Sequence, residues 1–273
     1  KTPMIAQILG AVVNIVLDPL LIFGLCGLPK MGISGAAIAT VTGQIVAAVV
    51  VWKKGYYTPP KSYKYLSLIR RIYVLGIPNI LMQSAYTIYI FGLNLILATF
   101  SDAAVTALGL YYKWQTFFFI PLGALQTCMV PIVSFNYAAK KWDRCKTALR
   151  TSLLYGVVLM MIGVLCFELI PHPMLSVFTQ SEEVKNIGTH AFHIIGISFI
   201  PMVTSLIFPV YFQALGCALK SSILTIVRTM CLFVPLGFVF SRFGLSYFWL
   251  TFPVTEVLTS CLGFVFYRKQ NKI

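Results

Sequence analysis

The chain has 273 residues, of which 59% are hydrophobic and 10% are charged. Ordinary soluble domains carry about 25% charged residues, so this composition argues against a soluble enzyme or a nucleic-acid-binding module. The net charge of +14 is therefore informative mainly through the positions of its 21 Lys and Arg residues. The seven cysteines include no CxxC pair, so neither a disulfide framework nor a zinc site is expected.

Apolar segments of membrane-spanning length recur along the chain. A helix needs about 20 apolar residues to cross a hydrocarbon core of about 30 Å. The sequence therefore predicts an all-α polytopic membrane protein with about eight transmembrane helices. They are expected at 4–26, 34–52, 72–98, 104–137, 147–170, 187–212, 221–240 and 246–267. The fourth is longer than a bilayer requires and should extend into water at its C-terminal end.

The connections between these segments alternate in charge. One set, at 1–3, 53–71, 138–150, 213–220 and 268–273, holds 16 basic residues and one acid, Asp143. The opposite set holds Lys30, Lys185 and Arg242 with three acids. Because basic residues are retained on the cytoplasmic side, both ends of the chain are predicted to be cytoplasmic.

The first helix carries a deep carboxylate. Asp18 follows Asn14 by four residues, so the two share a helix face, and Pro19 frees a backbone carbonyl one turn earlier. A desolvated carboxylate beside an amide can hold a proton or a sodium ion. Thr40 and Gln44, on one face of the small-residue second helix, can complete this ion-coupling site. The alternative is an interhelical hydrogen-bonding strut.

Further polar residues inside the spans are candidates for lining a substrate cavity. Lys113 can instead extend its ammonium group outward to the interface, and Glu256 is the only other deep carboxylate. The candidates are Asn79, Gln83, Asn94, Lys113, Gln126, Arg228 and Glu256.

A short internal repeat relates the first two helices to the last two. Asp18-Pro19-Leu20 followed by Gly32-Ile33-Ser34 matches Val234-Pro235-Leu236 followed by Gly244-Leu245-Ser246. Such a repeat is six helices long and is common in secondary transporters. It predicts that four further helices, needed for function, precede Lys1.

The chain carries no catalytic signature. It has no nucleophile elbow, HExxH motif, phosphate-binding loop or closely spaced carboxylate pair. We expect no enzyme activity, no metal site and no cofactor, with a proton or sodium ion as the coupling ion. Nucleic acid is not an expected partner.

Several segments resemble the multidrug and toxic compound extrusion (MATE) family. Asn14–Leu20 with Gly32–Thr40 resembles its fifth and sixth helices. Further similar segments are Leu75–Pro78, at the start of its seventh helix, Pro131–Ala139, at the end of its eighth, and Phe212–Gly216, at the end of its tenth.

This resemblance implies two six-helix bundles around a central cavity, with this chain holding helices five to twelve. Residues 1–53 would end the N-terminal lobe, 54–71 would link the lobes in the cytoplasm, and 72–273 would form the C-terminal lobe. The family exports amphipathic, often cationic, drugs and toxic compounds by antiport against protons or sodium ions. The resemblance to its bacterial members implies the plasma membrane of a bacterium (its inner membrane) as the location. Its ion-coupling Asp and Asn correspond to Asp18 and Asn14, and their acidic partner lies on a first helix that this chain lacks.

The sequence departs from the pattern of the family in one respect. Some sodium-coupled members use carboxylates on helices seven and ten, but 72–98 and 187–212 contain no Asp or Glu, which favours Asp18 as the coupling residue.

Two alternative functions remain. A lipid-linked oligosaccharide flippase of the same superfamily would need several cations to bind pyrophosphate, whereas only Lys113 and Arg228 lie within the spans. The other alternative is a membrane assembly protein that transports nothing.

Overall fold

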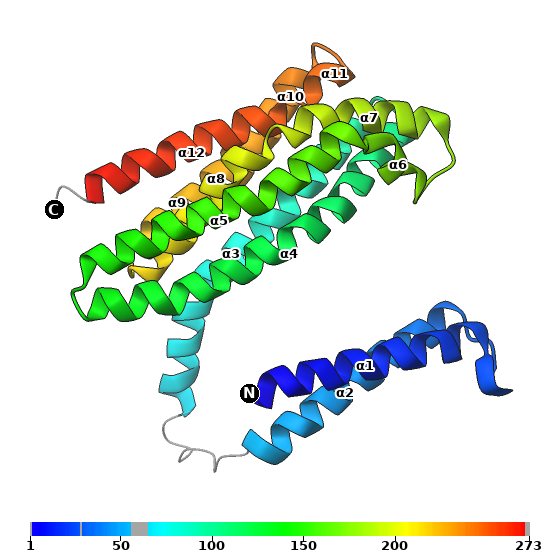
Figure 1. Ribbon diagram of the computed structural model, residues 1–273, viewed down its shortest axis with the longest axis horizontal. Coiled ribbons are helices and arrows are strands. Elements are labelled where there is room, and N and C mark those ends of the chain that lie inside the picture. Colours follow the sequence, from blue (N-terminus) through cyan, green and yellow to red (C-terminus); the bar gives the residue numbers. More distant parts are fainter. Residues whose placement is uncertain (1, 28, 56–64, 271–273) are drawn as a thin grey trace. The chain divides into compact units, whose positions relative to one another are not determined.

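The computed structural model describes residues 2–27, 29–55 and 65–270, except the side chains at 54–55, 71, 74–76, 78–79 and 81–83. Every regular element in these residues is helical (Figure 1). The elements are α1 (Thr2–Phe23), η1 (Leu25–Gly27), α2 (Ile33–Gly55), α3 (Tyr65–Ala98), α4 (Asp102–Ala138), α5 (Trp142–Leu169), α6 (Pro171–Ser176), α7 (Glu182–Gly196), α8 (Phe199–Ala214), α9 (Ala218–Ile226), η3 (Val227–Phe233), α10 (Val234–Ser241), α11 (Leu245–Phe248) and α12 (Thr251–Gln270).

The membrane-spanning pattern agrees with the hydropathy of the sequence. Among the described residues, six helices are long and apolar enough to cross a bilayer, and a bent pair formed by α7 and α8 raises this to seven. A shorter apolar stretch within α3, Ser84–Ala98, lies at the remaining predicted position. The prediction of an all-α polytopic membrane protein is confirmed, and α4 is 37 residues long, as its extended apolar pattern indicated.

The chain divides into two compact units, Lys1–Arg71 and Ile72–Ile273. α2 runs to Gly55 and α3 begins at Tyr65, so helix occupies both ends of the segment expected to link two lobes. The middle of that segment, 56–64, lies outside the described residues. Assignment of the units to two lobes of a larger transporter stays a prediction.

Small residues bring α1 and α2 of the first unit close together. A Cβ added to Gly43 would lie 2.6 Å from the carbonyl oxygen of Gly10, and one added to Gly35 would lie 2.6 Å from that of Leu21. Neither site has room for a side chain, so glycine sets the distance between the helices. Pro19 does not interrupt α1, which is one helix throughout.

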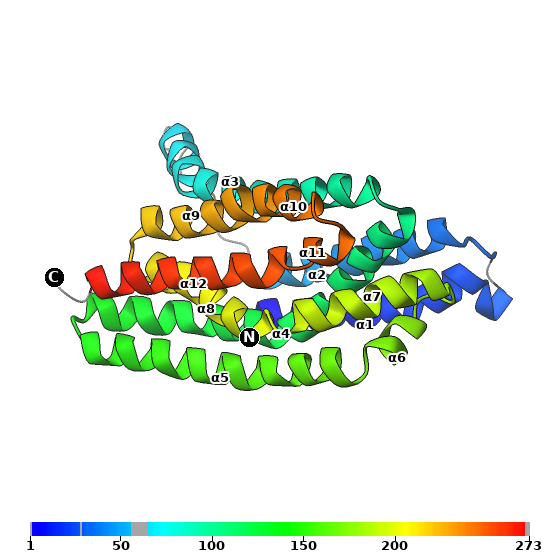
Figure 2. The ribbon, with the colours of Figure 1, turned by 90° about the horizontal axis from the view of Figure 1, so that it is seen from above.

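The second unit is a bundle whose long helices run side by side. Figures 1 and 2 show α4, α5, α8 and α12 lying along one another, and α8 packs against all three of the others. Aromatic rings fill the interior, with Phe167 stacked on Phe192 at 4.4 Å and Tyr89 stacked on Phe233 at 4.8 Å between ring centroids. The fully buried rings fix the register in which the polar residues meet.

Two of the expected spans are not regular helices. The sixth is broken, because α7 and α8 meet at 58° across Ile197 and Ser198. Pro201 cannot donate to the carbonyl of Ile197, and the amide of Ser198 donates instead to Ile195 at 2.8 Å in a tighter turn. The seventh contains the π-helical segment η3, which ends just before Pro235, where an α-helical bond to Cys231 is again lost.

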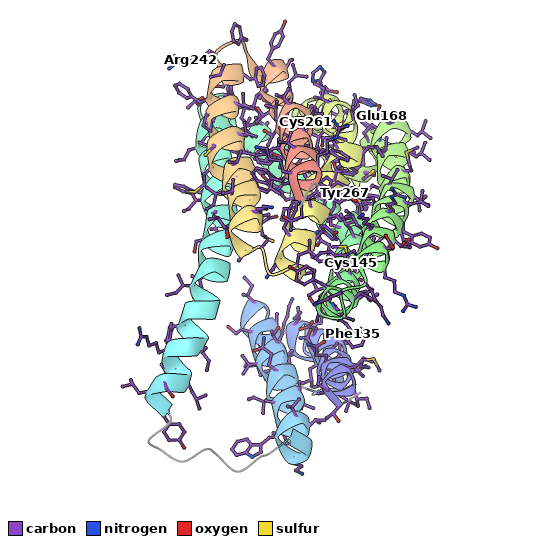
Figure 3. The ribbon with its side chains drawn as sticks, turned by 90° about the vertical axis from the view of Figure 1, so that its left-hand side faces the viewer. Phe135, Cys145, Glu168, Arg242, Cys261 and Tyr267 are labelled. Carbon is purple, nitrogen blue, oxygen red and sulfur yellow. The ribbon has the colours of Figure 1, made fainter. Side chains whose placement is uncertain are left out.

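The second unit has two distinct ends. Figure 3 shows Glu168 and Arg242 near one end, and Phe135 and Cys145 nearer the other. The first two belong to or adjoin the connections that are poor in basic residues, whereas Cys145 adjoins the basic connection between α4 and α5. The connections rich in basic residues and those poor in them therefore lie at opposite ends of one bundle. Which end is cytoplasmic stays a prediction.

Candidate functional site

The predicted ion-coupling residues lie along the contact between α1 and α2. The side-chain amide of Asn14 donates a hydrogen bond to Thr40 Oγ1 at 3.4 Å, and the Thr40 hydroxyl donates to the carbonyl of Ala36 at 2.9 Å. Asn14 and Thr40 are thus brought together. Gln44 is exposed and makes no hydrogen bond to Asp18 in the described structure.

The Asp18 carboxylate is incompletely satisfied. Its Oδ1 atom is buried and has no hydrogen-bond partner among the described residues. A buried acceptor left without a donor costs about 1–3 kcal/mol, and more if it is charged. A bound proton or cation would remove this cost, which makes Asp18 a chemically reasonable ion-binding group. The ion-coupling assignment itself stays a prediction.

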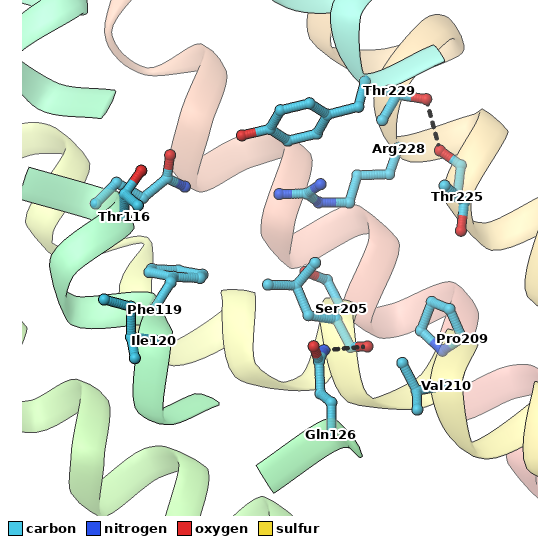
Figure 4. Close-up of a pocket in the computed structure, with 13 residues that line it drawn as sticks. Thr116, Phe119, Ile120, Gln126, Ser205, Pro209, Val210, Thr225, Arg228 and Thr229 are labelled. Carbon is cyan, nitrogen blue, oxygen red and sulfur yellow. Dashed lines mark hydrogen bonds between the residues drawn. The ribbon is translucent and has the colours of Figure 1, made fainter. Parts of the chain in front are cut away.

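A cavity of about 460 Å³ lies within the second unit. Figure 4 shows Thr116, Phe119 and Ile120 of α4 on one side and Thr225 and Thr229 on the other, with the Arg228 guanidinium pointing into the space between them. The remaining lining residues are Tyr86, Gln115, Gln126, Ser205, Leu206, Pro209 and Val210. Seven of the thirteen lining residues have polar side chains other than tyrosine, so the wall combines apolar and aromatic surface with several hydrogen-bonding groups, as small-molecule sites do.

Arg228, which lines this cavity, forms a buried ion pair with Glu256, which does not line it. Arg228 Nη2 donates to Glu256 Oε1 at 2.6 Å, and Arg228 Nε lies 3.1 Å from both carboxylate oxygens. The hydroxyl of Ser205 also donates to Glu256. Glu256 is fully buried on α12, and Arg228 is 6% exposed, so the pair joins α8, η3 and α12 and leaves this part of the cavity without net charge.

Of the other residues predicted to line a cavity, only some lie at this one. Gln126 lines the cavity, and its amide donates to the carbonyl of Leu206 at 3.0 Å. Asn94 instead donates to the carbonyl of Ile90 on its own helix, and it is not among the residues lining this cavity. Lys113 is exposed, with its ammonium nitrogen 4.8 Å from the centre of the Phe178 ring. The side chains of Asn79 and Gln83 lie outside the described residues.

Sequence reasoning missed several polar residues of the cavity. Ser205, Thr225 and Thr229 lie on apolar helices, where single hydroxyls usually bond to their own backbone, as Thr229 does to Thr225 at 2.7 Å. The spacing of Thr225 and Thr229 by four residues, beside Arg228, was an available signal. Gln115 was a second one, because an amide within an apolar helix needs a partner.

A family model described as MatE matches residues 78–239. The chain is similar to an FAD transporter of Shewanella oneidensis, with 25% identity over 287 residues, covering 100% of this chain and 62% of that protein. It is also similar to the multidrug export protein MepA of Staphylococcus aureus, with 24% identity over 251 residues, covering 89% of this chain and 54% of MepA.

A solved structure shares the fold. A multidrug resistance MATE family transporter of the MOP superfamily, in an outward-facing conformation, matches with a TM-score of 0.85 and 22% sequence identity. The match covers 98% of this chain and 61% of that transporter. The chain therefore spans between 54% and 62% of the length of these relatives.

Proposed function

This chain belongs to the MatE family, and we propose that it forms part of a secondary active multidrug efflux antiporter. The transporter exports amphipathic or cationic compounds in exchange for protons or sodium ions, and it works by alternating access. The named relatives are transporters and export proteins rather than enzymes. The prediction that four further helices complete the transporter belongs to this proposal.

The observation that carries the proposal is the cavity of the second unit. Its volume of about 460 Å³ suits a small organic molecule, and its one lining cation among the described residues, Arg228, is already paired with Glu256. Phe119 offers a ring face for stacking or for a cation, and Gln126 offers an amide. A site with this lining fits varied amphipathic molecules better than one fixed anion.

Coupling to an ion is proposed at Asp18. A proton or sodium ion bound at Asp18 neutralises its unpartnered oxygen, so the α1–α2 contact no longer contains an uncompensated buried charge. The ion can therefore shift the balance between two packings of these helices. The break between α7 and α8 and the π-helical η3 supply places where helices can bend as access alternates. Both features support alternating access without identifying the coupling ion.

The test replaces Asp18 and follows transport of an amphipathic cationic dye in vesicles from cells that produce the protein. Asp18→Asn keeps the shape and removes the titratable carboxylate, so ion-driven efflux should be lost. Asp102→Asn is the matched control, since Asp102 is an exposed first-turn residue of α4 and should tolerate the change. If the Asp18→Asn variant shows unchanged ion-driven efflux, Asp18 is not the coupling residue.

A flippase or other transporter of anionic substrates is the second candidate. The similarity to an FAD transporter favours testing it, because FAD carries a pyrophosphate. In the part of the chain that the structure describes, Arg228 is neutralised and Lys113 lies over Phe178 instead of lining this cavity. Transport of FAD but not of the dye by the same vesicles would favour this candidate, whereas an assembly protein would transport neither.

A further inference from the structure

The turn between α4 and α5 carries positive charge that no neighbouring acid neutralises. Lys140 and Lys141 lie in the turn and Arg144 in the first turn of α5. Asp143 is the single acid among them, and no carboxylate in the described part of the chain forms an ion pair with these three cations. Lys146 and Arg150 add two further cations on α5. The surface at this end of the bundle is therefore strongly basic.

A groove runs from this turn along α4 and α5. Its volume is about 420 Å³, and its apolar wall includes Leu125, Met129 and Ile132 of α4 and Ala148 of α5. Arg144 lines the groove at the turn and also lines a separate hollow of about 320 Å³ with Lys140, Lys141, Trp142 and Asp143. Arg144 therefore lies where the apolar groove meets this basic hollow, which we call the mouth of the groove.

The length of the groove matches one half of a bilayer. Its lining residues on α4 run from Leu125 to Asn136, which corresponds to about 16 Å of helix at 1.5 Å per residue. The hydrocarbon core is about 30 Å thick, so one leaflet occupies about half of that. A soluble anion would need only the mouth, whereas this groove continues to hydrocarbon depth.

The mouth has two further features of a headgroup site. Trp142 is 49% exposed and packs edge-to-face on Tyr137, with ring centroids 4.9 Å apart, which is the pairing expected at the level of lipid headgroups. The N-cap of α5, Lys141, makes no side-chain capping bond. The amide of Arg144 donates to the carbonyl of Lys141 at 3.1 Å, whereas the amides of Trp142 and Asp143 have no acceptor among the described residues and remain available to a phosphate.

We propose that the α4–α5 groove binds an anionic phospholipid of the membrane leaflet at this turn. The phosphate lies against Arg144 and Lys140, and one acyl chain lies along the apolar wall between α4 and α5. The basic charge selects the headgroup and the groove selects the chain, so neither free phosphate nor a zwitterionic lipid satisfies both parts. This site is separate from the cavity that contains Arg228.

The test measures lipid binding to the purified chain in detergent by native mass spectrometry. Palmitoyl-oleoyl phosphatidylglycerol and palmitoyl-oleoyl phosphatidylcholine share their acyl chains and differ in charge, so the first should bind more tightly. The double variant Lys140→Gln/Arg144→Gln should weaken phosphatidylglycerol binding about thirty-fold, since each basic residue near an anionic surface contributes about 1 kcal/mol. The control Arg268→Gln/Lys269→Gln removes the same charge from α12 and should leave binding nearly unchanged.

A second pair of variants tests the groove. Thr151→Trp fills it and should weaken binding, whereas Leu154→Trp adds the same bulk at an exposed position outside the groove and should not. Size-exclusion profiles and helix content establish that each variant is folded. Equal affinity for the two lipids, equal effects of the two charge-removing pairs, or displacement by millimolar inorganic phosphate would overturn the proposal.

Discussion

The ion pair between Arg228 and Glu256 provides the sharpest test of how the second unit is held together. Arg228→Met removes the guanidinium but keeps an unbranched side chain of similar volume. It leaves Glu256, which is fully buried, with the hydroxyl of Ser205 as its remaining donor among the described residues. The double variant Arg228→Met/Glu256→Met removes both charges. In that background Ser205 can still donate to the carbonyl of Met202, to which it is bonded at 3.1 Å.

The size of the effect follows from burial. Three contacts of 2.6–3.1 Å join the two side chains, and the partner that remains cannot reach water. Removing one member of a buried pair typically costs about 3–5 kcal/mol, whereas replacing both by apolar residues of similar volume is close to neutral. The single variant should therefore lose about 3–5 kcal/mol of unfolding free energy, and the double variant should recover most of it.

The assay is reversible unfolding of the purified chain in mixed micelles, followed by far-UV circular dichroism. Wild type, both single variants and the double variant form a thermodynamic cycle that isolates the coupling energy. We expect the loss in the double variant to be smaller than that in either single variant. If the losses of the single variants simply add in the double variant, the two side chains are not coupled and the reasoning is wrong.

Two further predictions concern packing and the cavity. Gly43→Ala should destabilise the α1–α2 contact by about 1–3 kcal/mol, because its Cβ meets the carbonyl oxygen of Gly10 at 2.6 Å. Gly109→Ala has open space in its helix and should be neutral or slightly stabilising in the same unfolding assay. Gln126→Leu should alter the KM for a transported dye, because Gln126 lines the cavity. Lys113→Met should leave that KM unchanged, because Lys113 lies over Phe178; equal effects of the two substitutions would contradict this assignment.

The sequence predicted most of what depends on local hydrophobicity. The lengths of the apolar segments predicted where the spans lie, because each segment must cross the hydrocarbon core. The distribution of Lys and Arg predicted that the two ends of the bundle differ in charge. The break at Ser198 and the π-helical η3 were not predicted. Pro201 and Pro235 marked places where a helical hydrogen bond is lost, but the sequence does not say whether the helix bends, widens or, as at Pro19, continues.

The candidate site was predicted less completely. Arg228 and Glu256 were each recognised as costly intramembrane charges, but their pairing across 28 residues depends on the register of η3 against α12. That register is set by packed rings such as Phe233 and Tyr89, which leave no local pattern in the sequence. The small residues of the second helix predicted a close contact between α1 and α2, with Thr40 and Gln44 reaching Asp18. In the described structure Thr40 instead accepts a hydrogen bond from Asn14, one turn before Asp18.

Ion-driven transport in proteoliposomes would show whether the protein is a cation-coupled antiporter. The native protein is reconstituted with an amphipathic cationic dye, and a proton gradient or a sodium gradient is imposed in the absence of ATP. We predict that one of these gradients moves the dye against its own concentration difference and that Asp18→Asn abolishes this movement. Dye movement that is the same with and without both gradients would mean that the protein is not a cation-coupled antiporter.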